Sequence, residues 1–250
     1  MLTTQRRALI LQRLARDGQV IAGALAQELD LSEDTIRRDL RDMAAAGLLK
    51  RVHGGALPVD APLPDLETRQ AISTDVKKRL GRAAAQMVRA GQLIFLDGGT
   101  TNAEIVHALP REMPITIATH SPAIASLLEK HRAEVILIGG RLYKHSMVAT
   151  GAAALAAIGM LRPDIFFLGA TAAHPVHGLS TGDHEEAAIK RAIIGQSAET
   201  VTLLTDKKLD AVSPHHIAGI SDMARMILPA GLGEDRIAPY RQSHVDIIEA

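Results

Sequence analysis

The stretch SEDTIRRDLRDM, residues 32–43, decides the fold of the first part of the chain. Ser32 is a residue type that favours the position just before a helix begins. The apolar side chains that follow recur at the spacing of one helix face: Ile36, Leu40 and Met43. At about 100° per residue, Arg38 and Arg41 then lie on the opposite face. This stretch therefore predicts a capped amphipathic helix with a buried apolar stripe and a basic outer face.

Two shorter helices precede this one and a hairpin follows it. The first ends at Gly18, and the second runs from about residue 21 to 29, before a turn at residues 30–31. Gly47 stops the third helix, and residues 48–57, with a His-Gly-Gly turn in the middle, predict a small β-hairpin. Two short helices, a tight turn and an arginine-bearing third helix are typical of a helix-turn-helix, of which the hairpin is the wing.

Such a unit places its third helix in the major groove, so we expect double-stranded operator DNA as a partner. The helix side chains expected to reach bases or nearby phosphates are Ser32, Thr35, Arg38 and Arg41. We expect Arg37 to pair with a phosphate or with Asp39 or Asp42. The residues expected to hold the DNA backbone or probe the minor groove from the wing are Lys50, Arg51 and His53. The alternative is a solvated charged face, but six basic groups coincide with a turn, a capped helix and a wing, which favours DNA binding.

The chain changes character after a proline-rich stretch. Residues 58–65 hold three prolines and no periodic pattern, which indicates a linker, and we assign the linker to residues 58–72. Short apolar runs then alternate with helical stretches, at residues 92–96, 115–118, 135–138, 165–168 and 201–204. Strands that are apolar throughout indicate a parallel sheet covered by helices on both faces. We therefore expect an α/β protein: a winged helix-turn-helix at residues 1–57, then a mostly parallel α/β domain at residues 73–250.

The sequence DGGTT, residues 97–101, lies between the first of these apolar runs and a helix. Glycines let backbone N–H groups approach an anion, a helix N-terminus adds partial positive charge, and threonine hydroxyls add donors. Ligands collect at the carboxyl ends of parallel strands, which is where this turn lies. The residues expected to bind an anionic effector are Asp97, Gly98, Gly99, Thr100 and Thr101. Arg141, after a later strand, is expected as a second anion partner.

Composition narrows the class of protein. The chain of 250 residues has 28 Lys plus Arg and 28 Asp plus Glu, so the clustering of charge, and not its zero total, bears on nucleic-acid binding. The absence of cysteine excludes disulfides, thiolate nucleophiles and cysteine metal sites. No stretch reaches the roughly 18 uninterrupted apolar residues of a membrane-spanning helix, and we expect a cytoplasmic protein without a membrane partner.

Several histidines are close in sequence: His174, His177, His184, His215 and His216. No acidic or cysteine partner completes a zinc pattern beside them, so we expect no metal and no cofactor. Asp183 and Glu186 are spaced as a capping box for a helix that runs to about residue 196, which gives Glu186 a structural role.

Two stretches together resemble the DeoR family of bacterial regulators: SEDTIRRDL at residues 32–40 and LKRVHGGA at residues 49–56. The similarity continues in the family's order through Lys77-Lys78, Gly81, FLDGGTT at 95–101, Gly139-Gly140, Gly151, DIF at 164–166 and GLST at 178–181. It covers nearly the whole chain, from about residue 3 to the C-terminus.

The resemblance implies that residues 73–250 form an effector-sensing and oligomerisation domain. Its fold should be similar to that of ribose-5-phosphate isomerases, glucosamine-phosphate deaminases and CoA transferases. The resemblance also implies a repressor of a sugar or polyol catabolic operon that responds to a phosphorylated sugar or polyol. The family has a lysine after the last apolar strand, and the resemblance places it at Lys208, which we expect to bind the effector. This chain is one residue short at that point, so Lys207 is the alternative. We expect a homo-oligomer, since one such helix recognises only a half-site.

An isomerase-like fold leaves one alternative open, a sugar-phosphate isomerase-like enzyme fused to a DNA-binding domain. Such an enzyme needs a carboxylate base beside the reacting carbon. Where the related isomerases have an acidic turn, this chain has FLGATA at residues 167–172, and capping accounts for Glu186. We therefore expect no catalytic residues and no enzyme activity.

Overall fold

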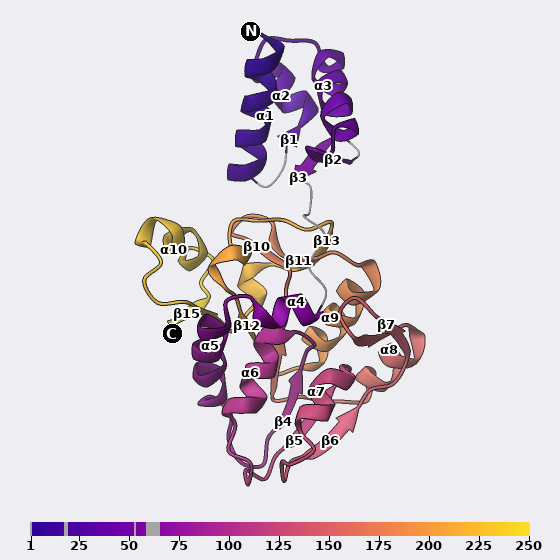
Figure 1. Ribbon diagram of the computed structural model, residues 1–250, viewed down its shortest axis with the longest axis vertical. Coiled ribbons are helices and arrows are strands. Elements are labelled where there is room, and N and C mark those ends of the chain that lie inside the picture. The colour runs from indigo at the N-terminus through magenta and orange to yellow at the C-terminus, as the bar shows by residue number, and fades with distance from the viewer. Residues whose placement is uncertain (1, 18–19, 53, 59–65) are drawn as a thin grey trace.

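The computed structural model describes residues 2–17, 20–52, 54–58 and 66–250 (Figure 1). The elements of its N-terminal unit are α1 (Thr3–Asp17), β1 (Val20–Ile21), α2 (Ala22–Glu28), α3 (Glu33–Ala45), β2 (Leu49–Val52) and β3 (Gly55–Pro58). The three strands form an antiparallel sheet in the order β1-β3-β2. The predicted helix-turn-helix and wing are confirmed, while the two-residue strand β1 was not expected.

A small apolar core holds this unit together. The face of α3 predicted to be buried is buried, and it packs against side chains from the other two helices and the sheet: Ile10, Leu14, Leu25, Ile36, Leu40, Met43, Leu49 and Ala56. Gly55 is required where β3 crosses β1, because a Cβ atom there would come within 1.9 Å of the Val20 carbonyl oxygen. The core thereby fixes the wing against the helices and leaves the outer face of α3 free.

The larger domain is built on a sheet of seven strands in the order β15-β14-β12-β9-β4-β5-β6, among the described residues. These strands are β4 (Leu93–Leu96), β5 (Thr116–Thr119), β6 (Glu134–Leu137), β9 (Ile165–Leu168), β12 (Glu199–Leu203), β14 (Arg225–Leu228) and β15 (Asp246–Glu249). Every neighbouring pair in this sheet is parallel. The first five correspond to the predicted apolar runs, with ends shifted by a residue or two.

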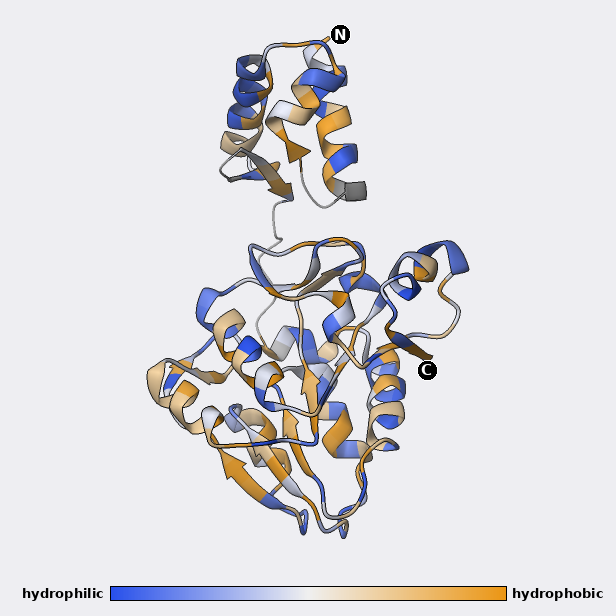
Figure 2. Cartoon of the chain, turned by 180° about the vertical axis from the view of Figure 1, so that it is seen from behind, coloured by the Kyte–Doolittle hydropathy of each residue, from blue (hydrophilic) through white to orange (hydrophobic). Residues whose placement is uncertain are grey.

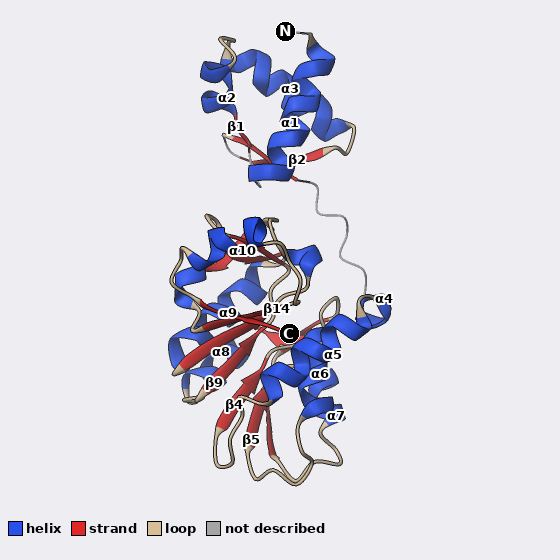
Figure 3. Ribbon diagram, turned by 90° about the vertical axis from the view of Figure 1, so that its left-hand side faces the viewer, coloured by secondary structure: helices blue, strands red, loops and turns tan. Residues whose placement is uncertain are grey.

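Helices cover both faces of the sheet (Figure 3). They are α5 (Thr74–Ala85), α6 (Thr100–Ala108) and α7 (Pro122–Leu127) on one face, and α8 (Ala152–Gly159) and α9 (His184–Gln196) on the other. Along β4, Phe95 packs into the cluster under α8 and α9, whereas Ile94 and Leu96 pack into the cluster under α5 and α6. Both faces of the strand are buried, which is why the sheet strands are hydrophobic along their length in Figure 2.

Shorter elements gather around the carboxyl ends of the main strands. They are α4 (Leu66–Ala71), β7 (Arg141–Tyr143), β8 (Val148–Thr150), β10 (Ala172–His174), β11 (Gly178–Thr181), β13 (His215–Ala218), the 3-10 turns at Asp206–Lys208 and Ile220–Asp222, and α10 (Glu234–Arg241). β10, β11 and β13 form an antiparallel sheet of their own. None of the described helices is both long and apolar enough to cross a membrane.

Candidate functional site

The start of α3 is fixed by a side-chain cap, as predicted. Ser32 has an extended backbone, and its hydroxyl accepts a hydrogen bond from the Thr35 backbone N–H at 3.2 Å. The two hydroxyls also lie 2.8 Å apart, within hydrogen-bonding distance. Arg38 and Arg41 are exposed on the face opposite the core, and no carboxylate of the described residues forms an ion pair with either of them. Their positive charges are therefore available to an external anion.

Two arginines of α1 bind the acidic residues of α3. Asp39 is buried, and Arg6 and Arg7 both form ion pairs with its carboxylate. Arg7 also pairs with Asp42 at 2.6 Å. The charge of these two acidic residues is thereby neutralised on the side of α3 that faces α1. The ion pairs also fix the rotation of α3 about its own axis.

The prediction that Arg37 pairs with Asp39 or Asp42 was wrong. Because Asp39 and Asp42 are engaged by α1, Arg37 pairs with Glu33, one turn earlier on α3, at 2.7 Å. On the wing, Lys50 and Arg51 are exposed on β2. His53, which was expected to act with them, lies outside the described residues.

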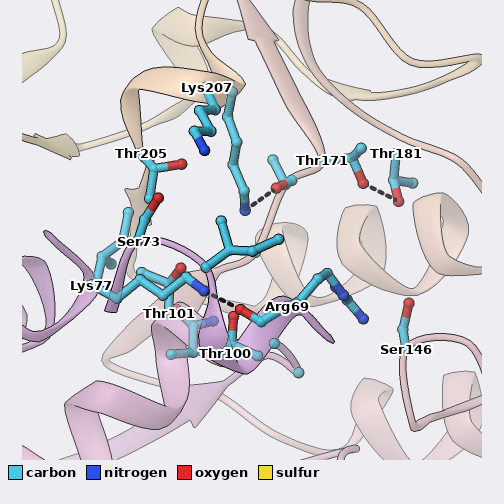
Figure 4. A pocket seen from close by; sticks show the side chains of 18 of the residues that line it. Arg69, Ser73, Lys77, Thr100, Thr101, Ser146, Thr171, Thr181, Thr205 and Lys207 are labelled. Carbon is cyan, nitrogen blue, oxygen red and sulfur yellow. Dashed lines mark hydrogen bonds between the residues drawn. The ribbon is translucent and has the colours of Figure 1, made fainter. Parts of the chain in front are cut away.

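A cavity of about 410 Å³ opens at the carboxyl ends of β4, β9 and β12 in the larger domain (Figure 4). Its walls come from α4 and the start of α5, the turn between β4 and α6, the segments that follow β9 and β12, and the first turns of α9. The lining side chains and glycines that carry the chemistry are Arg69, Ser73, Lys77, Gly98, Gly99, Thr100, Thr101, Ser146, Thr171, Thr181, Glu186, Lys190, Thr205, Lys207 and Lys208.

The predicted DGGTT turn supplies one wall of this cavity. Gly98, Gly99, Thr100 and Thr101 all line it. α6 begins at Thr100 behind Gly99, which has a φ of +119° and caps the helix without a side-chain hydrogen bond. The first N–H groups of α6 thus stand at the cavity wall, the arrangement that binds anions at helix N-termini.

Asp97 lies under the cavity floor and not at its surface. Its side chain is fully buried and accepts hydrogen bonds from the backbone N–H groups of Gly98 and Gly169, each at 2.8 Å. The Lys190 ammonium donates to it at 2.5 Å, and the His120 ring nitrogen Nε2 lies 2.8 Å away. Burial alone would raise the pKa of Asp97, but Lys190 and His120 together hold the pKa below its ordinary value. Asp97 therefore joins the ends of β4 and β9 to α9 as a charged group.

The cavity wall is strongly cationic. Five of its lining side chains carry positive charge: Arg69, Lys77, Lys190, Lys207 and Lys208. Lys208 donates to the Ala170 carbonyl oxygen at 2.6 Å. Burial, followed by repulsion from Arg69, Lys190 and Lys77, lowers the pKa of Lys208 to about 8. Burial and the nearby Arg69 also lower the pKa of Lys77. The cations here repel one another, so an anion in the cavity is favoured electrostatically.

Three of these cations were not predicted. Arg69 lies in the assigned linker, and Lys77 and Lys190 lie on helices. The sequence pattern could have indicated the two lysines, because each lies on the buried face of its helix. Lys77 shares that face with Leu80 and Ala84, and Lys190 shares it with Ile193. A lysine at a core position needs a partner or a ligand. Both Lys208 and its alternative, Lys207, line the cavity.

The expectation that Asp97 lines the effector site was wrong, because it lies under the cavity floor, and two further expected residues are placed differently. Arg141 is exposed and ion-paired with Glu185, and it is not among the residues that line the cavity. Asp183 does cap α9, accepting from the Glu186 N–H at 2.9 Å. The assignment of Glu186 to a capping box was wrong, however, because its carboxylate turns to the cavity and accepts from the Thr181 hydroxyl at 3.0 Å.

The histidines form pairs and not a metal site. The rings of His174 and His177 lie 4.6 Å apart between centroids, and those of His184 and His215 lie 5.6 Å apart. Within the part of the chain that the structure describes, no group of three or more His, Asp or Glu side chains is arranged to hold a metal ion.

Comparisons with known proteins agree with this two-part organisation. The model of the DeoR-like helix-turn-helix domain matches residues 6–61, and that of the DeoR C-terminal sensor domain matches residues 72–229. The chain is 31% identical over 223 residues to the glycerol-3-phosphate regulon repressor of Escherichia coli (strain K12), which covers 88% of each protein. It is 28% identical over 252 residues to the HTH-type transcriptional regulator GlpR of Haloferax volcanii, covering 100% of this chain and 98% of that protein.

Among solved structures, ribose 5 phosphate isomerase A from Neisseria gonorrhoeae aligns with a TM-score of 0.41 and 14% identity, covering 55% of this chain and 54% of that one. The family assignment stands on the sequence matches. Two domain models match in order over most of the chain, and a repressor of 31% identity matches 88% of it. The protein belongs to the DeoR family of transcriptional regulators.

Proposed function

We propose that this protein is a repressor that binds double-stranded operator DNA through α3 and the β2–β3 wing. The observation that carries the proposal is the exposed pair Arg38 and Arg41, on a helix whose carboxylates Asp39 and Asp42 are neutralised from behind by α1. Arginine binds guanine with two parallel hydrogen bonds and also pairs with phosphate. Ser32 and Thr35 at the helix start, and Lys50 and Arg51 on the wing, position the unit on the backbone. Arg37 and His53 complete the set of proposed DNA contacts.

The second part of the proposal is that a phosphorylated sugar or polyol occupies the cavity and controls DNA binding. Its phosphate binds at the N-terminus of α6, where Gly98, Gly99, Thr100 and Thr101 meet Lys77, Lys207 and Lys208. The glycerol-3-phosphate regulon repressor, a relative by sequence, is named for a compound of this class. A cavity of about 410 Å³ has room for a small carbohydrate phosphate.

Ligand and DNA are coupled through α4. This helix follows residues 59–65, which join it in sequence to the wing, and its Arg69 lines the cavity. A ligand can release DNA only if it binds the DNA-free arrangement more tightly than the DNA-bound one. The larger domain also makes the protein a homo-oligomer, which pairs two winged units on repeated half-sites in the cytoplasm.

We propose no catalytic activity. Among the described residues, Glu186 is the carboxylate that lines the cavity, and it accepts a hydrogen bond from Thr181. Asp97 is enclosed under the floor by its donors. Incubation with sugar phosphates in D₂O, followed by NMR, is expected to show no exchange of carbon-bound hydrogen. Exchange at the carbon next to a carbonyl would favour the isomerase-like alternative.

The DNA half is tested with a duplex selected by the purified protein from a random-sequence pool. Arg38→Ala is expected to weaken binding of that duplex by about tenfold or more, the effect of one lost bidentate contact. Arg13→Ala is the matched control, because it removes the same charge from α1 of the same unit, where Arg13 pairs with Glu28. Affinities are measured by fluorescence anisotropy. Equal affinities of the two variants would contradict the proposal that α3 contacts DNA.

The effector half is tested by thermal stabilisation across a panel of sugar and polyol phosphates and their unphosphorylated parents. At 100 times its dissociation constant, a ligand stabilises the native state by about 2.7 kcal/mol. A shift with a phosphate and not with its parent is expected. It should vanish when Thr100 and Thr101 are both replaced by Ala, and persist in the control Arg141→Ala, which lies outside the cavity.

A further inference from the structure

The cavity has two unlike ends. Lys77, Thr100 and Thr101 lie on one side and Thr171 and Thr181 on the other, and the Arg69 side chain extends from the first side toward the second (Figure 4). Arg69 repels both Lys77 and Lys190, whereas the attraction of Glu186 is exerted on Lys190.

Glu186 gives the second end its character. Its carboxylate is buried and lines the cavity, and the Thr181 hydroxyl donates to its oxygen Oε2 at 3.0 Å. An ionised carboxylate has about four acceptor positions, so this hydrogen bond leaves most of them for another donor. Lys190, one turn after Glu186 on α9, donates to the buried Asp97 at 2.5 Å, and Lys208 donates to the Ala170 carbonyl oxygen. Both ammonium groups are thus already engaged, and the Glu186 carboxylate offers a hydrogen-bond acceptor at the far end.

From this geometry we infer that Glu186 is a specificity residue that accepts hydroxyl groups from an uncharged end of the effector and excludes compounds with a second anionic group. The inference rests on the proposed function, since it presumes a phosphate at the N-terminus of α6. A carboxylate or second phosphate placed at the far end would meet the Glu186 carboxylate in a buried setting. Juxtaposed like charges of this kind are strongly unfavourable in a binding site. The effector class is therefore a singly phosphorylated polyol or sugar with a neutral, hydroxyl-bearing tail.

The test compares compounds that share a carbon skeleton and differ in the charge of one end. Suitable pairs are glycerol 3-phosphate with 3-phosphoglycerate, erythritol 4-phosphate with 4-phosphoerythronate, and glucitol 6-phosphate with 6-phosphogluconate. Dissociation constants of the full-length protein are measured by calorimetry or thermal titration. In the pair whose length fits the cavity, the polyol phosphate is expected to bind at least about tenfold more tightly than the acid.

Glu186→Gln removes the charge and keeps the shape, so it should reduce this preference to about threefold or less, chiefly by tightening the acid phosphate. Glu185→Gln is the matched control: it is the neighbouring carboxylate on α9, exposed and paired with Arg141, and it should leave the preference unchanged.

The outcomes separate the two proposals. Binding of an acid phosphate as tight as, or tighter than, that of its polyol partner in the unmodified protein overturns the inference and leaves a phosphate sensor standing. The inference is also overturned if both Glu186→Gln and Glu185→Gln keep the full preference for the polyol phosphate over the acid phosphate. Failure of every phosphate compound to bind overturns the proposed effector together with the inference.

Discussion

Asp97→Asn is expected to destabilise the larger domain severely while changing almost nothing in its shape. In the native protein the carboxylate receives the N–H groups of Gly98 and Gly169, the Lys190 ammonium and a contact from His120. An asparagine amide offers one acceptor oxygen, and its NH₂ group must face donors on the other side. Lys190, itself buried, then loses its ion pair with Asp97, and among the described residues Glu186 is the remaining carboxylate that favours its charged form.

Breaking a buried ion pair from one side costs about 3–5 kcal/mol, because the remaining charge stays desolvated. That is a large part of the roughly 5–15 kcal/mol by which a typical domain is stable. The double variant Asp97→Asn with Lys190→Met removes both charges and should recover at least about 1 kcal/mol relative to the single one. Glu185→Gln, at an exposed pair with Arg141, should cost no more than about 1 kcal/mol.

Urea unfolding followed by tyrosine fluorescence measures this domain selectively. The chain has no Trp and two Tyr, and both of these, Tyr143 and Tyr240, belong to the larger domain. The midpoint of Asp97→Asn should fall well below that of Glu185→Gln at a similar dependence on urea concentration. A loss below about 1 kcal/mol, or a double variant less stable than Asp97→Asn alone, would refute the role given to the pair.

Two further changes have measurable consequences. A bound anion favours the charged form of Lys208, whose pKa in the free protein is about 8, so phosphate affinity should fall as the pH rises through that value. Between pH 7 and pH 9 the phosphate affinity measured by calorimetry should decrease by about tenfold. Lys208→Met should abolish this decrease. An equally steep decrease in that variant would mean that another group titrates. Asp39→Ala removes the buried carboxylate that forms ion pairs with both Arg6 and Arg7, and should lower the stability of the N-terminal unit by about 3–5 kcal/mol. An early far-UV circular dichroism transition should then separate from the unchanged tyrosine transition, whereas Asp42→Ala, which removes an exposed carboxylate, should not separate them.

The fold could be predicted where local rules act alone. Ser32 caps α3, Ile36, Leu40 and Met43 are buried, and the apolar runs are parallel strands, because period and capping are properties of neighbouring residues. β14 and β15 were missed although they belong to the same sheet. The short strands β10 and β11 were missed because they have three or four residues and depend on contacts across the fold.

The candidate site could be predicted only in part for a related reason. The DGGTT turn is contiguous in sequence and was found, whereas Arg69, Lys77 and Lys190 reach the same cavity from α4, α5 and α9. Arg141 was expected because it follows β6 at the end of a strand, but Glu185 engages it outside the cavity. The end of a strand places a residue near the right edge of the sheet without fixing where its side chain turns.

At α4, the proposed effector site meets the segment that leads to the DNA-binding unit. Among the bonds that hold this helix, Lys77 donates to the Arg69 carbonyl oxygen, and the Arg69 guanidinium donates to the His145 carbonyl oxygen at 3.1 Å. Both donors line the cavity, so we expect a phosphate bound at the start of α6 to compete with α4 for them. A tenfold change in DNA affinity needs only about 1.4 kcal/mol of difference between the two arrangements. One charge-assisted hydrogen bond contributes about that much, so exchanging a single bond of α4 for a bond to the ligand is sufficient to couple the two sites.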